Sequence, residues 1–117
     1  MEKLFDSELR LMEVIWKHEP VSAKKISLLA AQEFSWNKNT TYTVIKRLIE
    51  KEILRRDEPG FICSSIVKRD DVQKAETKTL IEKLFGGSKK AFFAAFANEK
   101  LSPDEVEALK ALLETKG

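Results

Sequence analysis

The side chains best suited to specific binding lie in one short stretch, from Asn39 to Arg47. On a helix with about 3.6 residues per turn, the apolar residues of this stretch share one face and the polar residues share the other. The polar face, with its boundary positions, combines an amide, hydroxyls and cations: Asn39, Thr40, Tyr42, Thr43, Lys46 and Arg47. An amide can bridge adenine, threonine offers a hydroxyl and a methyl group, and lysine or arginine binds guanine or phosphate. The pattern predicts a helix that reads DNA.

Two pairs of cations flank this stretch. Lys24 and Lys25 fall in the first turn of the preceding predicted helix, where free backbone N–H groups also favour a phosphate. Arg55 and Arg56 follow the stretch and border a predicted hairpin whose tip is acidic. We expect both pairs to contact DNA phosphates. The hairpin contribution should be weak and should come from its arginines rather than from its tip.

The distribution of charge is more informative than the net charge of +2. Residues 21–56 hold eight basic and three acidic side chains, whereas residues 70–117 hold eight basic and nine acidic ones. A basic region joined to a nearly neutral, aromatic-rich region is typical of a nucleic-acid reader with an association module. The alternative is a solvated cationic surface, on which Thr40 merely caps its helix and Arg47 pairs with Glu50 or Glu52.

Few residues could support catalysis or bind a metal. The chain has one cysteine, Cys63, and one histidine, His18, which is too few for an internal disulfide or a protein-only zinc or haem site. It has no glycine-rich phosphate loop, no secretory signal and no run of about 18 apolar residues. We therefore expect no enzyme activity, no cofactor, no catalytic or metal-binding residue, no membrane insertion and a cytoplasmic location. Cys63 is interpreted as a small buried residue.

The elements that must position the polar stretch are three helices followed by a hairpin. Helical periodicity and capping residues mark the helices, and a change to short β-branched runs around Pro59-Gly60 marks the hairpin. This order predicts a winged helix-turn-helix in residues 1–69. The expected elements are a helix from Asp6 or Ser7 to before Pro20, a helix capped by Ser22 and ending at Phe34, a helix from Thr40 to about Lys51, and strands at 53–56 and 61–66.

Residues 70–117 are predicted to form three further helices. The first ends at Gly86-Gly87, the second follows a Ser88 cap, and the third begins with the capping box of Ser102 and Glu105. Three short helices cannot bury all of their large apolar side chains, so we expect this segment to form a homodimer. The residues expected at that interface are Leu84, Phe85, Phe92, Phe93, Phe96, Leu101, Val106, Leu109, Leu112 and Leu113. The fold class is thus mainly α with a small β-hairpin wing (α+β), an N-terminal winged helix-turn-helix followed by a C-terminal helical dimerisation segment.

The sequence resembles the penicillinase-repressor family of bacterial winged-helix regulators over nearly its full length. Four stretches carry the resemblance: LRLMEVIW at 9–16, NTTYTVIKRLIEKEIL at 39–54, KLFGGS at 83–88 and LSPDEVEALKALL at 101–113. The resemblance implies a dimer that binds a dyad-symmetric operator and represses transcription.

The resemblance also implies a way to release the operator. In antibiotic-responsive members of the family, a membrane sensor-protease signals β-lactam, and the repressor is cleaved within its dimerisation segment before a phenylalanine. The matching bond here joins Ala95 to Phe96, with alanine where the family typically has asparagine. Two half-sites held by one dimer gain about 10²–10⁴ in effective affinity, so loss of the dimer would release the DNA.

Two other functions remain open at this point. The winged helix could bind a protein while the aromatic segment docks another chain. The protein could also be a ligand-sensing activator, with a pocket between its C-terminal helices, although few polar groups converge there.

Overall fold

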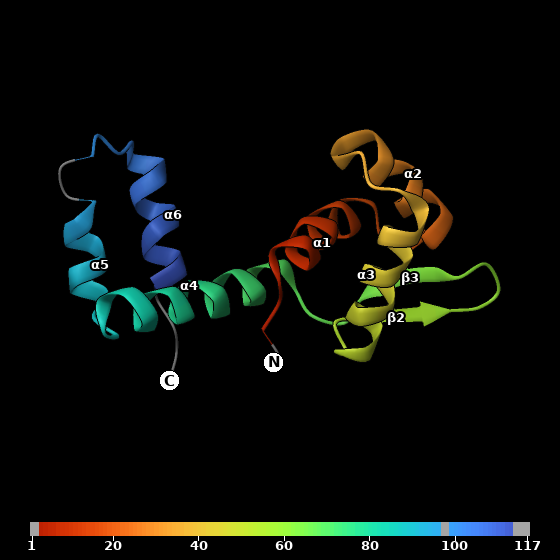
Figure 1. Cartoon of the computed structure of the whole chain (residues 1–117). Helices are drawn as coiled ribbons and strands as arrows, with labels where there is room; N and C mark the ends of the chain where they lie inside the picture. The colour runs from red at the N-terminus through yellow and green to blue at the C-terminus, as the bar shows by residue number, and fades with distance from the viewer. Residues whose placement is uncertain (1–2, 97–98, 114–117) are drawn as a thin grey trace. The chain divides into compact units, whose positions relative to one another are not determined.

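The computed structural model describes residues 3–96 and 99–113, with the side chains of Leu112 and Leu113 left out of the description. The chain divides into two compact units, Met1–Arg69 and Asp70–Gly117 (Figure 1). Each unit has its own packing and is described by itself.

Three helices form the larger part of the first unit: α1 (Asp6–His18), α2 (Ala23–Phe34) and α3 (Lys38–Glu50). The sequence predicted the N-cap of α2 correctly but not that of α1. Ser22 caps α2 as predicted, since its Oγ accepts the Lys25 N–H at 3.1 Å. Neither Asp6 nor Ser7 caps α1, whose N-cap is Phe5.

The start of α3 corrects one interpretation. Thr40 does not cap this helix, because the side chain of Asn37 accepts the Thr40 N–H at 2.8 Å. The helix therefore begins at Lys38 and gains most of a turn before Thr40. Asparagine is a favourable N-cap because its side-chain oxygen satisfies an otherwise free backbone N–H. The extra residues place Asn39 inside the first turn.

The sheet has three antiparallel strands in the order β1-β3-β2: β1 (Val21–Ser22), β2 (Leu54–Asp57) and β3 (Ile62–Ser65). The predicted hairpin is present, displaced by one residue at its edges, and in Figure 1 it extends beyond the three helices as a wing. We call β2, β3 and their connecting turn the wing. The sequence did not predict β1, because two residues carry no alternation and Ser22 also caps α2. The predicted fold class, mainly helical with a small wing, is confirmed.

The core of the first unit is apolar and completely enclosed. The helices contribute most of it, and the strands close it with Leu54 and Cys63. Its fully buried side chains include Leu11, Met12, Ile15, Ile26, Ile45, Leu48 and Ile53. This core fixes α3 against the rest of the unit, so the exposed face of α3 has a defined orientation.

One charged side chain, Glu8, is fully buried in this unit. Its Oε1 accepts hydrogen bonds from the Lys51 ammonium and from the Phe5 N–H, both at 2.7 Å. Lys51 also donates to the Lys3 carbonyl at 2.9 Å and lies 4.4 Å from the centre of the Phe5 ring. Lys51, the C-cap of α3, thereby links this helix to Lys3 and Phe5, which precede α1.

The second unit contains α4 (Arg69–Phe85, beginning one residue before the unit boundary), α5 (Lys89–Ala95) and α6 (Pro103–Leu113). Its caps follow the sequence prediction: the Ser88 Oγ accepts the Ala91 N–H, and Ser102 and Glu105 form a reciprocal capping box. Gly86 and Gly87 end α4 with φ values of +59° and +84°, which glycine adopts without steric cost. Its small core consists of Ile81 and Phe92, with Phe85, Phe93 and Leu109 packed partly against them.

Candidate nucleic-acid interface

Helix α3 has one buried and one exposed face, as the sequence predicted. Thr41, Val44, Ile45 and Leu48 are buried. The exposed side chains are Asn39, Thr40, Thr43, Lys46 and Arg47, and Tyr42 is half-buried. Because α3 is anchored through its apolar face, this polar face is presented on a rigid element.

The hydroxyl of Thr43 already donates its hydrogen within α3. It donates to the Asn39 carbonyl at 2.9 Å, one helical turn earlier. The oxygen keeps lone pairs that can accept a hydrogen bond, and the methyl group remains exposed. Thr43 is therefore suited to accept from a base amino group or to touch a thymine methyl, rather than to donate.

Two of the cations on α3, Lys46 and Arg47, have no carboxylate partner among the described residues. In the described part of the chain, neither Lys46 nor Arg47 forms an ion pair, and the alternative pairing of Arg47 with Glu50 or Glu52 is absent. Both guanidinium and ammonium groups are exposed and available to an external anion.

Tyr42 connects α3 to the wing. Its ring meets the Phe61 ring edge-on, with the two centroids 5.9 Å apart, and the Lys38 ammonium lies 5.8 Å from the Tyr42 ring centre. The sequence placed Tyr42 on the outward face but did not identify Phe61 as its neighbour. Phe61 was assigned to a strand, whereas it lies in the turn with φ +51°. In this turn its ring contacts Tyr42 of α3.

The wing arginines are held within the wing. Arg55 Nε donates to Asp57 Oδ2 at 3.1 Å, and Arg56 pairs in the same way with Glu58. The Arg56 guanidinium also lies 3.6 Å from the centre of the Phe61 ring. The hydrogen bond from Arg56 lowers the pKa of Glu58, so this carboxylate stays charged at neutral pH.

Lys24 and Lys25 are exposed in the first turn of α2. The sequence predicted free N–H groups here, but the Ala23 N–H donates to the Phe61 carbonyl at 2.9 Å and the Lys25 N–H donates to the Ser22 Oγ at 3.1 Å. The positive charge at this end of α2 therefore comes mainly from the two ammonium groups. This end of α2 is therefore a second cationic surface of the first unit, separate from the α3 face.

The residues assigned to dimerisation divide into a small cluster and exposed positions. The ring centroids of Phe85 and Phe92 are 5.5 Å apart, and those of Phe92 and Phe96 are 5.2 Å apart. Leu84 is 65% exposed and Phe96 is 39% exposed, whereas Leu101, Val106 and Leu109 are half-buried. The side chains of Leu112 and Leu113 lie outside the described residues.

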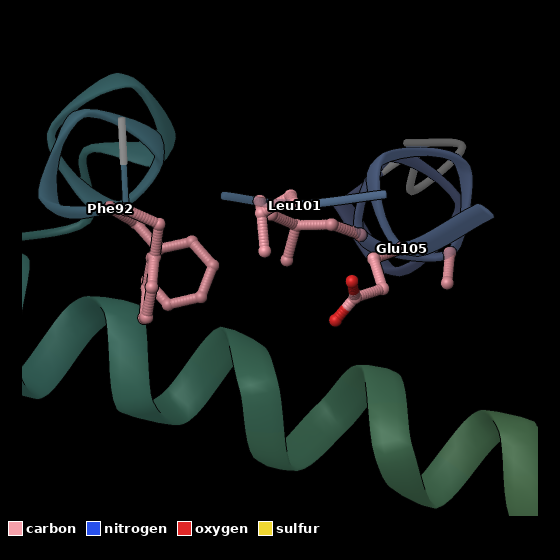
Figure 2. Close-up of a pocket in the computed structure, with 6 residues that line it drawn as sticks. Phe92, Leu101 and Glu105 are labelled. Carbon is pink, nitrogen blue, oxygen red and sulfur yellow. The ribbon is translucent and has the colours of Figure 1, made fainter. Parts of the chain in front are cut away.

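An open, mainly apolar pocket of about 320 Å³ lies in the second unit. Figure 2 shows Phe92, Leu101 and Glu105 at this pocket, which Phe96, Ala108 and Leu109 also line. Among the described lining residues, the only charged group is Glu105, and the Ser102 N–H donates to its carboxylate at 3.0 Å. The lining offers an apolar surface and little to orient a polar ligand.

The described residues hold no cluster of His, Cys, Asp or Glu side chains arranged to bind a metal ion. Nor does any described helix combine the length and apolar character needed to cross a membrane. Cys63 is buried in β3, and burial raises the pKa of its thiol to about 11. The prediction of a small buried residue is correct, and a thiol with so high a pKa is a poor nucleophile.

A winged helix that holds a polar, cationic helix face on a rigid core is the fold and site of a DNA-binding protein. The model of one family, described as penicillinase repressor, matches residues 4–115. The chain belongs to the penicillinase repressor family, a family of DNA-binding transcriptional repressors rather than enzymes. The resemblance stated from the sequence, and the expectation that the protein is no enzyme, are confirmed.

Individual relatives agree over nearly the whole chain. The penicillinase repressor of Staphylococcus aureus is 36% identical over 110 residues, covering 92% of this chain and 87% of the relative. The methicillin resistance regulatory protein MecI of Mammaliicoccus sciuri is 28% identical, covering 97% of this chain and 95% of MecI.

Two solved structures are similar to part of the chain. The DNA-binding domain of the repressor BlaI has a TM-score of 0.54 at 28% identity, covering 59% of this chain and 90% of that domain. The Bacillus licheniformis BlaI monomeric form in complex with the blaP half-operator has the same TM-score and identity, covering 60% of this chain and 88% of its own.

Proposed function

We propose that this protein is a dimeric repressor that binds a dyad-symmetric operator with one α3 helix in each half-site. The observation that carries the proposal is the exposed face of α3, on which Lys46 and Arg47 have no partner among the residues that the structure describes. The similar BlaI structure supports it, because that monomeric form is bound to half an operator.

The exposed side chains divide by the part of the duplex they suit. Tyr42, Thr43 and Lys46 would face base edges in the major groove, and Tyr42 and Thr43 lie toward the N-terminal end of the helix, where such contacts concentrate. Asn39, Thr40 and Arg47 border them. Lys24 and Lys25, at the start of α2, would contact the phosphate backbone, which fixes position without reading sequence.

Dimerisation through residues 70–117 is supported by the apolar side chains that one chain leaves in water. Leu80, Leu84 and Phe96 are all exposed in the single chain. A second copy would cover such side chains and would join two DNA-binding units.

Release of the operator would follow from loss of this dimer. The candidate cleavage bond lies at the C-terminal end of α5, where Ala95 and Phe96 are both exposed. A cut there would separate α6 from α4 and α5. A membrane sensor-protease that acts on a cytoplasmic repressor would supply such a cut, by analogy with the family's antibiotic-responsive members.

The test is binding to a duplex that covers the upstream region of the protein's own gene. The Thr43→Ala/Lys46→Ala variant should bind it at least about tenfold more weakly, since each specific contact is worth roughly 1–3 kcal/mol. The control, Lys17→Ala, removes an exposed ammonium group from α1, outside both the α3 face and the proposed dimerisation segment.

The control should bind as the wild type does, and the α3 variant should remain dimeric in sedimentation. Raising the salt from 50 to 200 mM should weaken wild-type binding by roughly 10³–10⁵, which an apolar protein interface would not show. Unchanged binding by the Thr43→Ala/Lys46→Ala variant would remove α3 from the reading role.

A further inference from the structure

The two adjacent arginines of β2 lie on opposite faces of the wing. Successive side chains of a strand alternate between faces, so Arg56 shares its face with the buried Leu54, and Arg55 lies on the other side. The register agrees, because Arg56 is paired with the buried Cys63 and Arg55 with Ser64. The inner face of the sheet is therefore the face of Arg56.

On this inner face, Arg56 lies beyond the buried core and close to α3. Its guanidinium stacks on the Phe61 ring, and the same ring meets Tyr42 of α3 edge-on. Phe61 therefore fixes a cation beside the helix that carries the polar face. Arg55, on the outer face, has no such aromatic neighbour among the described residues.

Each arginine has its own carboxylate two residues later. Asp57 holds Arg55, and Glu58 holds Arg56. Glu58 has a second contact, because its Oε2 accepts the Phe61 N–H at 3.2 Å. The arginine, the carboxylate and the ring thus form one connected group at the tip of the wing.

We propose that Glu58 competes with DNA phosphate for Arg56, so that the duplex backbone must displace this carboxylate before the wing can contribute to binding. The inference rests on the proposed function and deepens it. A carboxylate and a phosphate oxygen offer the guanidinium the same charge-assisted hydrogen bonds. Glu58 therefore lowers the affinity for every duplex and leaves discrimination to α3.

The expected size of the effect is modest because the pair is exposed to water. Exposed ion pairs are weak, so removing the competitor should tighten binding by only about two- to fivefold. Arg56 would then gain a phosphate contact without giving up a partner. The slope of log affinity against log salt should steepen by up to about one unit.

The experiment compares two variants of the full chain on the upstream-region duplex and on an unrelated duplex of equal length. Glu58→Gln removes the charge and keeps an oxygen for the Phe61 N–H. Asp57→Asn is the matched control, because it removes the same charge from the pair on the outer face. Glu58→Gln should tighten binding to both duplexes about two- to fivefold, with less than half of that gain from Asp57→Asn.

A third comparison isolates the pair itself. In an Arg56→Gln background, Glu58→Gln should gain no more than Asp57→Asn does in the wild type, because the cation that it would release is absent. Equal gains from Glu58→Gln and Asp57→Asn, or a full gain from Glu58→Gln without Arg56, would overturn the inference in favour of a general charge effect. A wild type that binds DNA while Glu58→Gln binds no tighter would overturn the inference alone. Failure of the wild type to bind any duplex would overturn the proposed function as well.

Discussion

The two units of this chain differ in how much of their apolar surface they cover by themselves. Among the described residues, all of the buried apolar side chains except Val72, Ile81 and Phe92 belong to the first unit. The first unit also places its one buried acid, Glu8, against a cation. The second unit leaves Leu80, Leu84 and Phe96 exposed, and its core cluster has two buried side chains, Ile81 and Phe92.

This difference implies that the first unit is stabilised by its own core, whereas the second unit needs additional burial of its apolar side chains. A unit with an enclosed core can hold a binding face without outside help, whereas three short helices around a small core depend on further burial. A signal that acts on the second unit could therefore change the assembly while leaving the reading face intact. The two units can also be followed separately, because both tryptophans, Trp16 and Trp36, and the one tyrosine, Tyr42, lie in the first.

The largest effect should come from removing the cation of the buried pair. Lys51→Met leaves the Glu8 carboxylate, which is fully buried, without a compensating charge. We expect the free energy of unfolding of the first unit to fall by about 3 kcal/mol. Urea titration followed by tryptophan fluorescence measures this loss.

Two comparisons establish the cause of that loss. Lys17→Met, at an exposed lysine of α1, should change the free energy of unfolding by less than about 0.5 kcal/mol. Glu8→Leu/Lys51→Met should recover most of the loss, because the buried charge is gone. A Lys51→Met variant as stable as the wild type would show that Glu8 is adequately solvated without its partner.

The next effect concerns assembly rather than folding. Leu84→Asp changes a side chain that is 65% exposed in the single chain, so it should leave unfolding of the first unit unchanged. If a second copy covers Leu84, the dimer dissociation constant should rise at least about tenfold, as expected for an apolar residue within an interface. Sedimentation at micromolar concentration measures it.

Leu28→Asp provides the matched control for this experiment. Leu28 is 54% exposed and lies on α2 of the first unit, outside the proposed dimer interface. This variant should sediment as the wild type does. Equal sedimentation of the Leu84→Asp variant and the wild type would contradict the proposed interface.

The sequence located the parts of the molecule that local rules determine. Helical periodicity assigned the buried and exposed faces of α3, and capping residues marked the starts of α2, α5 and α6. Prediction failed in two places: β1 is two residues long and carries no local signal, and Asn37 rather than Thr40 caps α3 although asparagine is a favourable N-cap. Asn37 was missed because it was read as part of a polar break.

Long-range contacts also could not be predicted from the sequence. Glu8 looks like an ordinary first-turn acid, and its partner is 43 residues away. The contact between Tyr42 and Phe61 is made by a turn residue with a positive φ, and a phenylalanine in the sequence gives no indication of that conformation. The candidate DNA-contacting residues could thus be named from the sequence, but the ion pairs that restrain the wing could not.

A smaller effect is expected at the cap of α6. Ser102→Ala removes the oxygen that accepts the Glu105 N–H at 3.1 Å, which should cost the second unit about 1 kcal/mol. Far-UV circular dichroism should show helix loss at a lower urea concentration while tryptophan fluorescence is unchanged. Ser22→Ala, at the cap of α2, should instead shift the fluorescence transition. A shift in fluorescence for Ser102→Ala would show that the two units do not unfold separately.

The smallest effect is a pH dependence of the second unit. Hydrogen bonds from the Ser102 backbone and side chain lower the pKa of Glu105 below its usual 4.5. A carboxyl with a depressed folded-state pKa stabilises the fold fully above the unfolded value of 4.5 and loses that contribution as the pH falls through the folded value. Helix content of the second unit should therefore decline in acid below pH 4.5, and Glu105→Gln, which cannot titrate, should lose this component of the decline. If the Glu105→Gln variant lost as much helix in acid as the wild type, measured by circular dichroism at fixed urea, the loss would come from other carboxylates.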